Sequence, residues 1–138
     1  MLDENLSIEE VKKIRRERYN RTRSMPCPLL KEEVFFNKDG FYHATHDGRG
    51  KLRNKSDATM RLHLLPWIYR VIKKSRTHAS PPRIIPISDP ENKTGKEIVF
   101  YELSYKFKLA KNKTVSVILR KIGNGQLHYF SVRYTKTK

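Results

Sequence analysis

In EIVFYELSYKFKL, residues 97–109, large apolar residues recur at every second position. This period of two is typical of a β-strand that buries one face. The pattern returns in TVSVILRKI (114–122) and QLHYFSVRYTK (126–136), with turn signals at Asn112 and at residues 123–125 between them. The last third of the chain therefore predicts three consecutive antiparallel strands.

The last of these strands predicts the side of the sheet that meets a ligand. Strict alternation places Tyr129, Ser131 and Arg133 on one face, and Phe130 and Val132 on the other. The first face carries hydroxyl and guanidinium groups. We therefore expect it to stay open while a helix covers the apolar face.

That helix is predicted over residues 57–75, where apolar side chains recur every three to four positions. Asp57 is the expected cap, and Pro66 predicts a break that leaves residues 66–75 as the stronger piece. The proline-rich stretch 80–97 predicts a loop or an edge crossing. These parts together predict an α+β fold, an antiparallel β-sheet with a helix packed on one face.

The first third of the chain predicts two different regions. Residues 7–19 read as a basic helix capped by Ser7, and residues 20–32 read as a proline-containing linker. We therefore divide the chain into a helix and linker, residues 1–32, and an α+β domain, residues 33–138. Within the second region, Asn37-Lys38-Asp39-Gly40 predicts a hairpin between strands at 33–37 and 40–44, or one strand followed by an extended loop.

The charge of the chain points to a polyanionic partner. Its 138 residues contain 30 Lys and Arg against 14 Asp and Glu, a net charge of +16. Phosphates favour such a surface because each contact releases condensed counterions, so RNA is the leading expected partner. No apolar run approaches the ~20 residues of a membrane span, and Cys27 is the only cysteine. We expect a soluble, cytoplasmic protein with no membrane contact.

Two histidines form the leading catalytic candidate. His43 and His46 lie in HATHDGRGK, close to Lys51. Two imidazoles can act as general base and general acid on an RNA 2′-hydroxyl and its leaving 5′-oxygen, while Lys51 stabilises the phosphorane. Surface histidines without a catalytic role are the alternative. A metal site is a weaker one because Asp47 is the only adjacent carboxylate, and we expect no metal or cofactor.

Further basic and aromatic residues are candidates for binding RNA. Ser131 and Arg133 can hold one phosphate together and Tyr129 can stack on a base, although an ordinary solvent-facing strand would show the same pattern. The other candidates lie in the basic loop and on the helix: Arg49, Arg53, Lys55, Arg61 and Arg70. No GxxxxGK[ST], GxSxG or HExxH motif occurs, so common nucleotide hydrolases, esterases and zincins have no support.

The order of these parts resembles a known superfamily. A histidine-bearing segment before a basic loop, a helix containing LPWI, a proline-rich connection and three strands ending in HYFSVRY are similar to the small metal-independent ribonucleases that group barnase, EndoU, the ribonuclease colicins and RelE, particularly their phage and toxin branches. The resemblance covers about residues 33–138. It implies a four- or five-stranded antiparallel sheet with RNA on one face, and transesterification to a 2′,3′-cyclic phosphate and a 5′-hydroxyl.

The resemblance also implies roles for single residues. His43 or His46 looks like the early catalytic histidine, and Ser131 and Arg133 look like the polar row of the last strand. The chain departs from the barnase pattern because it has no obvious glutamate base at the centre of the sheet, unless Glu102 serves. We expect a metal-independent endoribonuclease that acts on RNA, with tRNA as one candidate, and that is restrained by an acidic antitoxin or immunity protein. The alternative is a non-catalytic RNA- or DNA-binding module.

Overall fold

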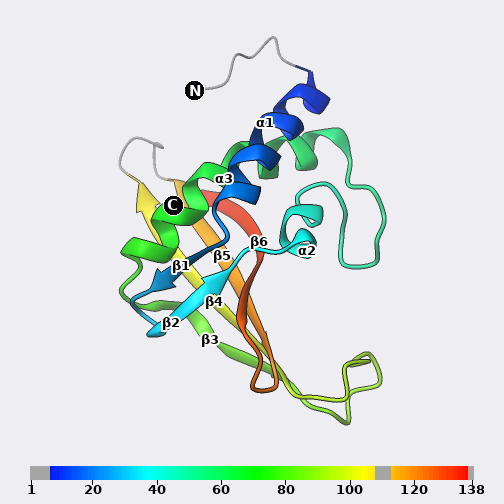
Figure 1. Ribbon diagram of the computed structural model, residues 1–138, viewed down its shortest axis with the longest axis vertical. Coiled ribbons are helices and arrows are strands. Elements are labelled where there is room, and N and C mark those ends of the chain that lie inside the picture. The colour runs from blue at the N-terminus through cyan, green and yellow to red at the C-terminus, as the bar shows by residue number, and fades with distance from the viewer. Residues whose placement is uncertain (1–6, 108–112, 137–138) are drawn as a thin grey trace.

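Six strands form one sheet, in the order β1-β2-β6-β5-β4-β3, in the computed structural model, which describes residues 7–107 and 113–136 (Figure 1). Their bounds are β1 (Ser24–Cys27), β2 (Glu32–Phe35), β3 (His78–Ile85), β4 (Ile98–Phe107), β5 (Lys113–Ile122) and β6 (Leu127–Lys136). All neighbours are antiparallel except β2 and β6, which run parallel. The α+β class is confirmed, but the sheet is mixed and larger than expected.

The three strands predicted from the alternating pattern are confirmed as β4, β5 and β6. The turn predicted at Asn112 lies outside the described residues. Strict alternation along β6 is wrong, because a bulge gives this strand one extra residue: Ser131 pairs with Ile118, whereas Tyr129 pairs with Leu119. Tyr129 therefore turns into the core, and Phe130 turns to the face that carries Arg133.

One face of the sheet is covered by α3 (Lys55–Lys74), which crosses it in Figure 1. The predicted break at Pro66 is wrong, since the helix continues through it. An internal proline costs about 3 kcal/mol. Each large apolar side chain that is buried regains about 1.5–3 kcal/mol, and both halves of α3 supply them: Leu62, Leu65, Ile68, Val71 and Ile72. Asn54 rather than Asp57 caps the helix, accepting from the Asp57 amide.

The hairpin predicted around Asn37 is also wrong. Residues Lys38–Tyr42 form a short helix, α2, after β2. The Asn37 side chain accepts a hydrogen bond from the Gly40 amide at 3.1 Å, so it caps a helix and does not turn a hairpin. Gly40 fits beside the backbone oxygen of Tyr129, which places α2 against β6.

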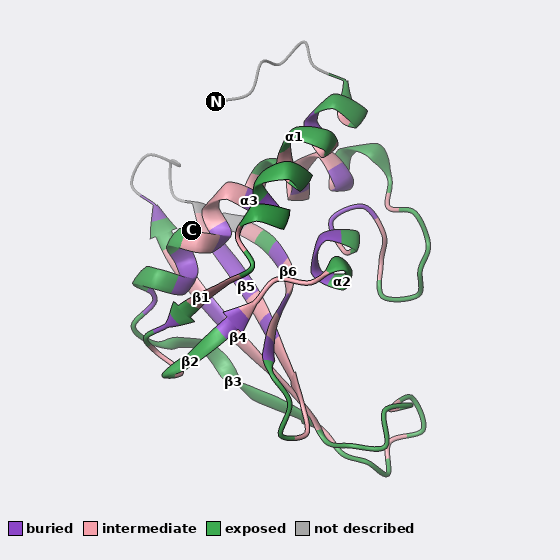
Figure 2. Cartoon of the chain, in the orientation of Figure 1, coloured by how far each residue is buried: buried purple, intermediate pink, exposed green. Residues whose placement is uncertain are grey.

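The N-terminal helix α1 (Ile8–Arg21) starts after Ser7, as predicted, but it belongs to the main core. Val11 and Tyr19 are buried, and the Tyr19 hydroxyl donates to the Asn37 carbonyl at 2.6 Å. Figure 2 shows that α1 has both buried and exposed segments. The predicted linker contains β1, an edge strand of the sheet. The division at residue 32 therefore does not separate two folding units. None of the described helices is both long and apolar enough to cross a membrane.

Both outer strands of the sheet contain proline. β3 contains Pro81 and Pro82 and is exposed along nearly its whole length, and β1 contains Pro26. Proline has no N–H for a strand ladder, so it fits an edge strand. The edge crossing predicted within residues 80–97 is β3, and the loop that follows connects it to β4.

Candidate active site

The face of the sheet opposite α3 carries a mixed aromatic and charged surface, here called the open face. Its members alternate with the buried residues of β4, β5 and β6 that pack under α3. A cleft of about 270 Å³ lies on this face, and side chains from four strands line it, among them Ser80, Arg83, Phe100, Glu102, Ile118, Phe130 and Arg133. The open face therefore combines charged, hydroxyl and aromatic side chains with room for a ligand.

Glu102 carries the carboxylate in this cleft. Arg133 Nη2 donates to one of its oxygens at 2.9 Å, and Ser80 Oγ donates to the other at 3.0 Å. Its side chain is 19% exposed. Burial pushes the pKa of Glu102 up, but the hydrogen bonds from Arg133 and Ser80 outweigh burial and bring the net pKa below its ordinary value. Glu102 is therefore ionised at neutral pH, in the form that can accept a proton.

Two arginine–aromatic pairs flank the carboxylate. The Arg83 guanidinium lies 4.8 Å from the Phe100 ring centroid, and the Arg120 guanidinium lies 4.8 Å from that of Phe130. The two rings meet edge to face at 5.2 Å. Flat rings and guanidinium planes are surfaces on which nucleic acid bases stack, and the same guanidinium groups attract phosphate.

His43 joins the open face from α2. It follows the last residue of that helix, and its ring centroid lies 4.1 Å from that of Phe130. Burial and the positive charges of Arg53 and Arg120 lower the pKa of His43 below its ordinary value. His43 is therefore mainly neutral at pH 7 and gains its proton only in more acidic solution.

This lowered pKa predicts a pH dependence of stability. The unfolded state binds a proton on His43 more readily, so the free energy of unfolding falls as pH drops below about 6.5, until the folded imidazole also protonates. We expect His43→Gln to reduce the loss of stability between pH 7.5 and 5.5 in urea denaturation. His63→Gln, at an exposed histidine of α3, is the control. An unchanged pH dependence in His43→Gln would contradict the prediction.

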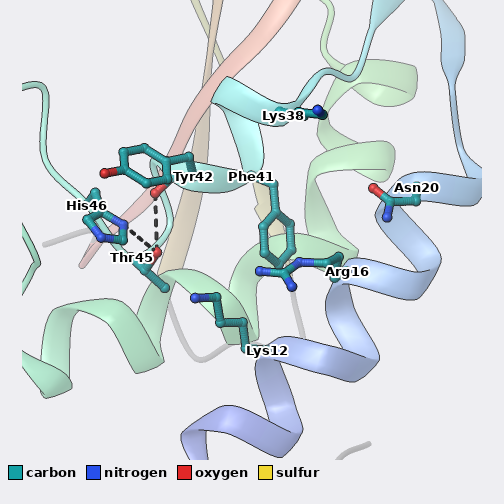
Figure 3. Close-up of a pocket in the computed structure, with 8 residues that line it drawn as sticks. All are labelled: Lys12, Arg16, Asn20, Lys38, Phe41, Tyr42, Thr45 and His46. Carbon is teal, nitrogen blue, oxygen red and sulfur yellow. Dashed lines mark hydrogen bonds between the residues drawn. The ribbon is translucent and has the colours of Figure 1, made fainter. Parts of the chain in front are cut away.

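The structure does not place His46 beside His43. The His46 ring stacks on Tyr42, with centroids 3.9 Å apart and planes 5° apart, and its Nδ1 lies 2.8 Å from Thr45 Oγ1 (Figure 3). These contacts belong to a second cavity, which lies between α1 and α2. His43 and His46, predicted as an acid–base pair, therefore lie at two different sites: His43 at the open face, and His46 at the cavity between α1 and α2.

The structure does not bring Ser131 and Arg133 together around one ligand, because their side chains have different partners. Arg133 is half exposed and pairs with Glu102. Ser131 Oγ accepts a hydrogen bond from Arg61 at 3.0 Å, and the same Arg61 nitrogen donates to the Val132 carbonyl at 2.9 Å. Arg61 also binds Asp57, so it connects α3 with β6.

Arg53 has a similar structural role. Its Nε donates to the His43 carbonyl at 2.9 Å, and its Nη1 donates to Asp57 at 3.1 Å. Asp57 therefore holds two arginines, and through them it connects the start of α3 with α2 and with β6. Both arginines were predicted to bind RNA, but they are mostly covered and their donors are engaged within the fold.

The remaining predicted residues lie apart from the cleft. The ring of Tyr129 is 1% exposed and belongs to the core, so it is not available to stack on a base as predicted. Arg70 lies over Trp67 on α3, on the covered side of the sheet. Of the predicted residues, Arg49, Lys51 and Lys55 are exposed, in the loop and in the first turn of α3. Across residues 7–107 and 113–136, no group of three or more His, Cys, Asp and Glu side chains is placed to hold a metal ion.

Several residues of the cleft were not predicted. Arg83 lies in a proline-rich stretch without apolar alternation, and Phe130 was placed on the wrong face because a bulge leaves no mark in the sequence pattern. The positions of Phe100, Glu102 and Arg120 do follow from alternation, since Phe100 pairs with Arg120 and Glu102 is two residues further along β4. The second face of β4 and β5 therefore carries the signal for Phe100 and Arg120, beside Glu102, which the sequence already offers as a possible base.

Comparisons of the chain with family models, with curated proteins and with solved structures find no match. The resemblance to the barnase, EndoU, colicin and RelE ribonucleases stays a prediction. The geometry of the open face is therefore the basis of the proposed function.

Proposed function

We propose that this protein is a metal-independent endoribonuclease whose active site is the open face of the sheet. The observation that carries the proposal is an ionised carboxylate, Glu102, in a cleft that also presents Arg83, Arg133 and two aromatic rings. RNA matches such a cleft, because its phosphates can accept hydrogen bonds from the guanidinium groups and its bases can stack on the aromatic rings.

The proposed reaction is a transesterification. Glu102 would accept the proton of a ribose 2′-hydroxyl, the 2′-oxygen would form a bond to the adjacent phosphorus, and the bond from phosphorus to the 5′-oxygen would break. The imidazolium of His43 would give a proton to the leaving 5′-oxygen. Arg83, Arg120 and Arg133 would neutralise the charge on the phosphorane, whose oxygens carry more charge than those of the substrate.

A cleavage assay with defined products tests this proposal. Single-stranded RNA is incubated with the protein in EDTA, and a 2′-deoxy chain of the same sequence serves as the control substrate. We expect the RNA alone to be cleaved, with 2′,3′-cyclic phosphate and 5′-hydroxyl ends. Cleavage should be faster at pH 6 than at pH 8, because more of the His43 population is then protonated. Cleavage of the 2′-deoxy chain, or none of the RNA, would overturn the proposal.

The second candidate is a nucleic-acid-binding module without catalysis. One observation favours it: both oxygens of Glu102 already accept hydrogen bonds from Arg133 and Ser80, as in an ordinary structural ion pair. Such a module would bind RNA on the open face and release it intact. An acidic protein inhibitor, the other partner expected from the sequence, would cover the same cations, and it would compete with RNA under either candidate function.

A further inference from the structure

A second cavity lies between α1 and α2, away from the cleft that holds Glu102. Its volume is about 440 Å³, and it is walled by the exposed ends of side chains from both helices and from the turn that follows α2. Figure 3 shows Lys12 and Arg16 reaching from α1 toward Phe41 and the turn at Thr45 and His46. We call it the helix pocket, with Lys12, Arg16, Lys38, Phe41, Tyr42 and His46 as its defining residues.

The charge of the helix pocket is positive and unneutralised. Lys12, Arg16 and Lys38 all line it, and none of the three forms an ion pair within residues 7–107 and 113–136. The carboxylates that the described ion pairs use lie elsewhere, on Glu32, Asp57 and Glu102. Three cations around one cavity repel each other, so an anion placed among them would be attracted by all three.

The other wall of the helix pocket is aromatic. Tyr42 is 47% exposed, and His46 stacks on one face of its ring. The contact between Thr45 Oγ1 and His46 Nδ1 holds the imidazole in this orientation. Arg16 lies 5.2 Å from the Phe41 ring centroid, which fixes its guanidinium at the mouth of the cavity. A stacked aromatic pair beside a cluster of cations matches the two ends of a nucleotide, its base and its phosphate.

We propose that the helix pocket binds one nucleotide unit, with the phosphate on Lys12, Arg16 and Lys38 and the base against Tyr42. This inference goes beyond the proposed function, because it needs no chemistry on the open face. His43 and His46 are three residues apart, so the two sites are separated by a short turn whose extended length is at most about 11 Å. A strand that occupies the helix pocket could therefore continue toward the open face.

Binding of adenosine 5′-monophosphate to the intact protein tests the inference. Affinity is measured by calorimetry at low salt, and the site is located from amide chemical shifts of residues 12–20 and 38–46. Lys12→Ser should weaken binding about tenfold, since it removes one charge-assisted contact. Lys13→Ser is the matched control, because this exposed neighbour on α1 has the same charge but does not line the pocket. Equal losses in the two variants would overturn the proposal.

The contributions of the base and of the phosphate to binding are distinguished with a smaller ligand, inorganic phosphate, and a larger one, an oligonucleotide. Inorganic phosphate should bind at least several-fold more weakly than the nucleotide, and Tyr42→Ala should remove most of that difference. Phosphate that binds as well as the nucleotide would overturn the assignment of a base to Tyr42. A 2′-deoxy oligonucleotide then distinguishes a strand from a free nucleotide. The oligonucleotide should bind more tightly and also change the amide chemical shift of His43, whereas a free mononucleotide should change only the chemical shifts of the helix pocket.

The outcome is independent of cleavage. A protein that binds the nucleotide in the helix pocket and leaves RNA intact would retain this inference and lose the proposed ribonuclease. The opposite outcome is equally clear. If the parent and Lys12→Ser cleave RNA at the same rate and no nucleotide binds between α1 and α2, the proposed ribonuclease is retained and the nucleotide site in the helix pocket is lost.

Discussion

Replacing Glu102 by glutamine should slow RNA cleavage by about 10²- to 10⁴-fold, the usual contribution of a general base. Glutamine keeps the shape of the side chain and can still accept a hydrogen bond from Arg133, but it cannot take the proton of a 2′-hydroxyl. The loss should appear in kcat, with a smaller change in KM. Single-turnover cleavage of a labelled RNA, with EDTA present, measures the effect.

Two controls make this result specific. Glu33→Gln removes a carboxylate from an exposed position of β2 that has no ion pair among the described contacts, and it should cleave at the parent rate. The thermal unfolding of Glu102→Gln should stay within a few degrees of the parent, because a partly exposed ion pair contributes little to stability. A folded Glu102→Gln variant that cleaves as fast as the parent would remove Glu102 from the reaction.

Among the described glycines, Gly40 is the one at which replacement by alanine should lower the free energy of unfolding most. A Cβ at this position would lie 2.5 Å from the Tyr19 hydroxyl, 2.6 Å from the Tyr129 carbonyl oxygen and 2.7 Å from the Tyr129 ring. Overpacking of this kind costs about 3 kcal/mol, which corresponds to a loss of about 10 °C in Tm for a domain of this size. The backbone oxygen cannot move without shifting β6, so relaxation would disturb α2 instead.

Gly48→Ala is the matched control, since no atom lies within 4 Å of the added methyl group. Its free energy of unfolding should stay within about 0.5 kcal/mol of the parent value. Differential scanning calorimetry of both variants gives the comparison. If Gly40→Ala melts at the temperature of Gly48→Ala, the close packing of α2 against β6 is not what stabilises this region.

Much of the sheet could be predicted because its strands follow a period of two. β4 and β5 are ten residues long, and they pair without a register shift, so the side chains of both strands alternate between the two faces of the sheet. The sequence pattern therefore predicts that these strands exist and in which order they follow. The region around Asn37 could not be read in this way. Asn-Lys-Asp-Gly is typical of a hairpin turn, but Asn37 also suits a helix cap, and the burial of Phe41 against Tyr19 decides between them.

The site was harder to predict than the fold. Glu102 follows from the regular alternation of β4, whereas its contact with Arg133 joins two residues that are 31 positions apart in the chain. Arg53 and Arg61 looked like solvent-facing cations, but Asp57 holds both of them, and a sequence does not show which carboxylate an arginine selects. His43 and His46 looked like one pair because they are close in sequence, yet a tight turn points their rings to different sites.

The prolines of β1 and β3 also bear on how the protein behaves at high concentration. A strand from a second copy can extend a sheet only where the outer strand offers an unbroken row of amide donors, which is how many proteins begin to aggregate. Pro26 interrupts that row at one boundary, and Pro81 and Pro82 interrupt it at the other. These prolines therefore make both outer strands poor templates for fibre-like self-association.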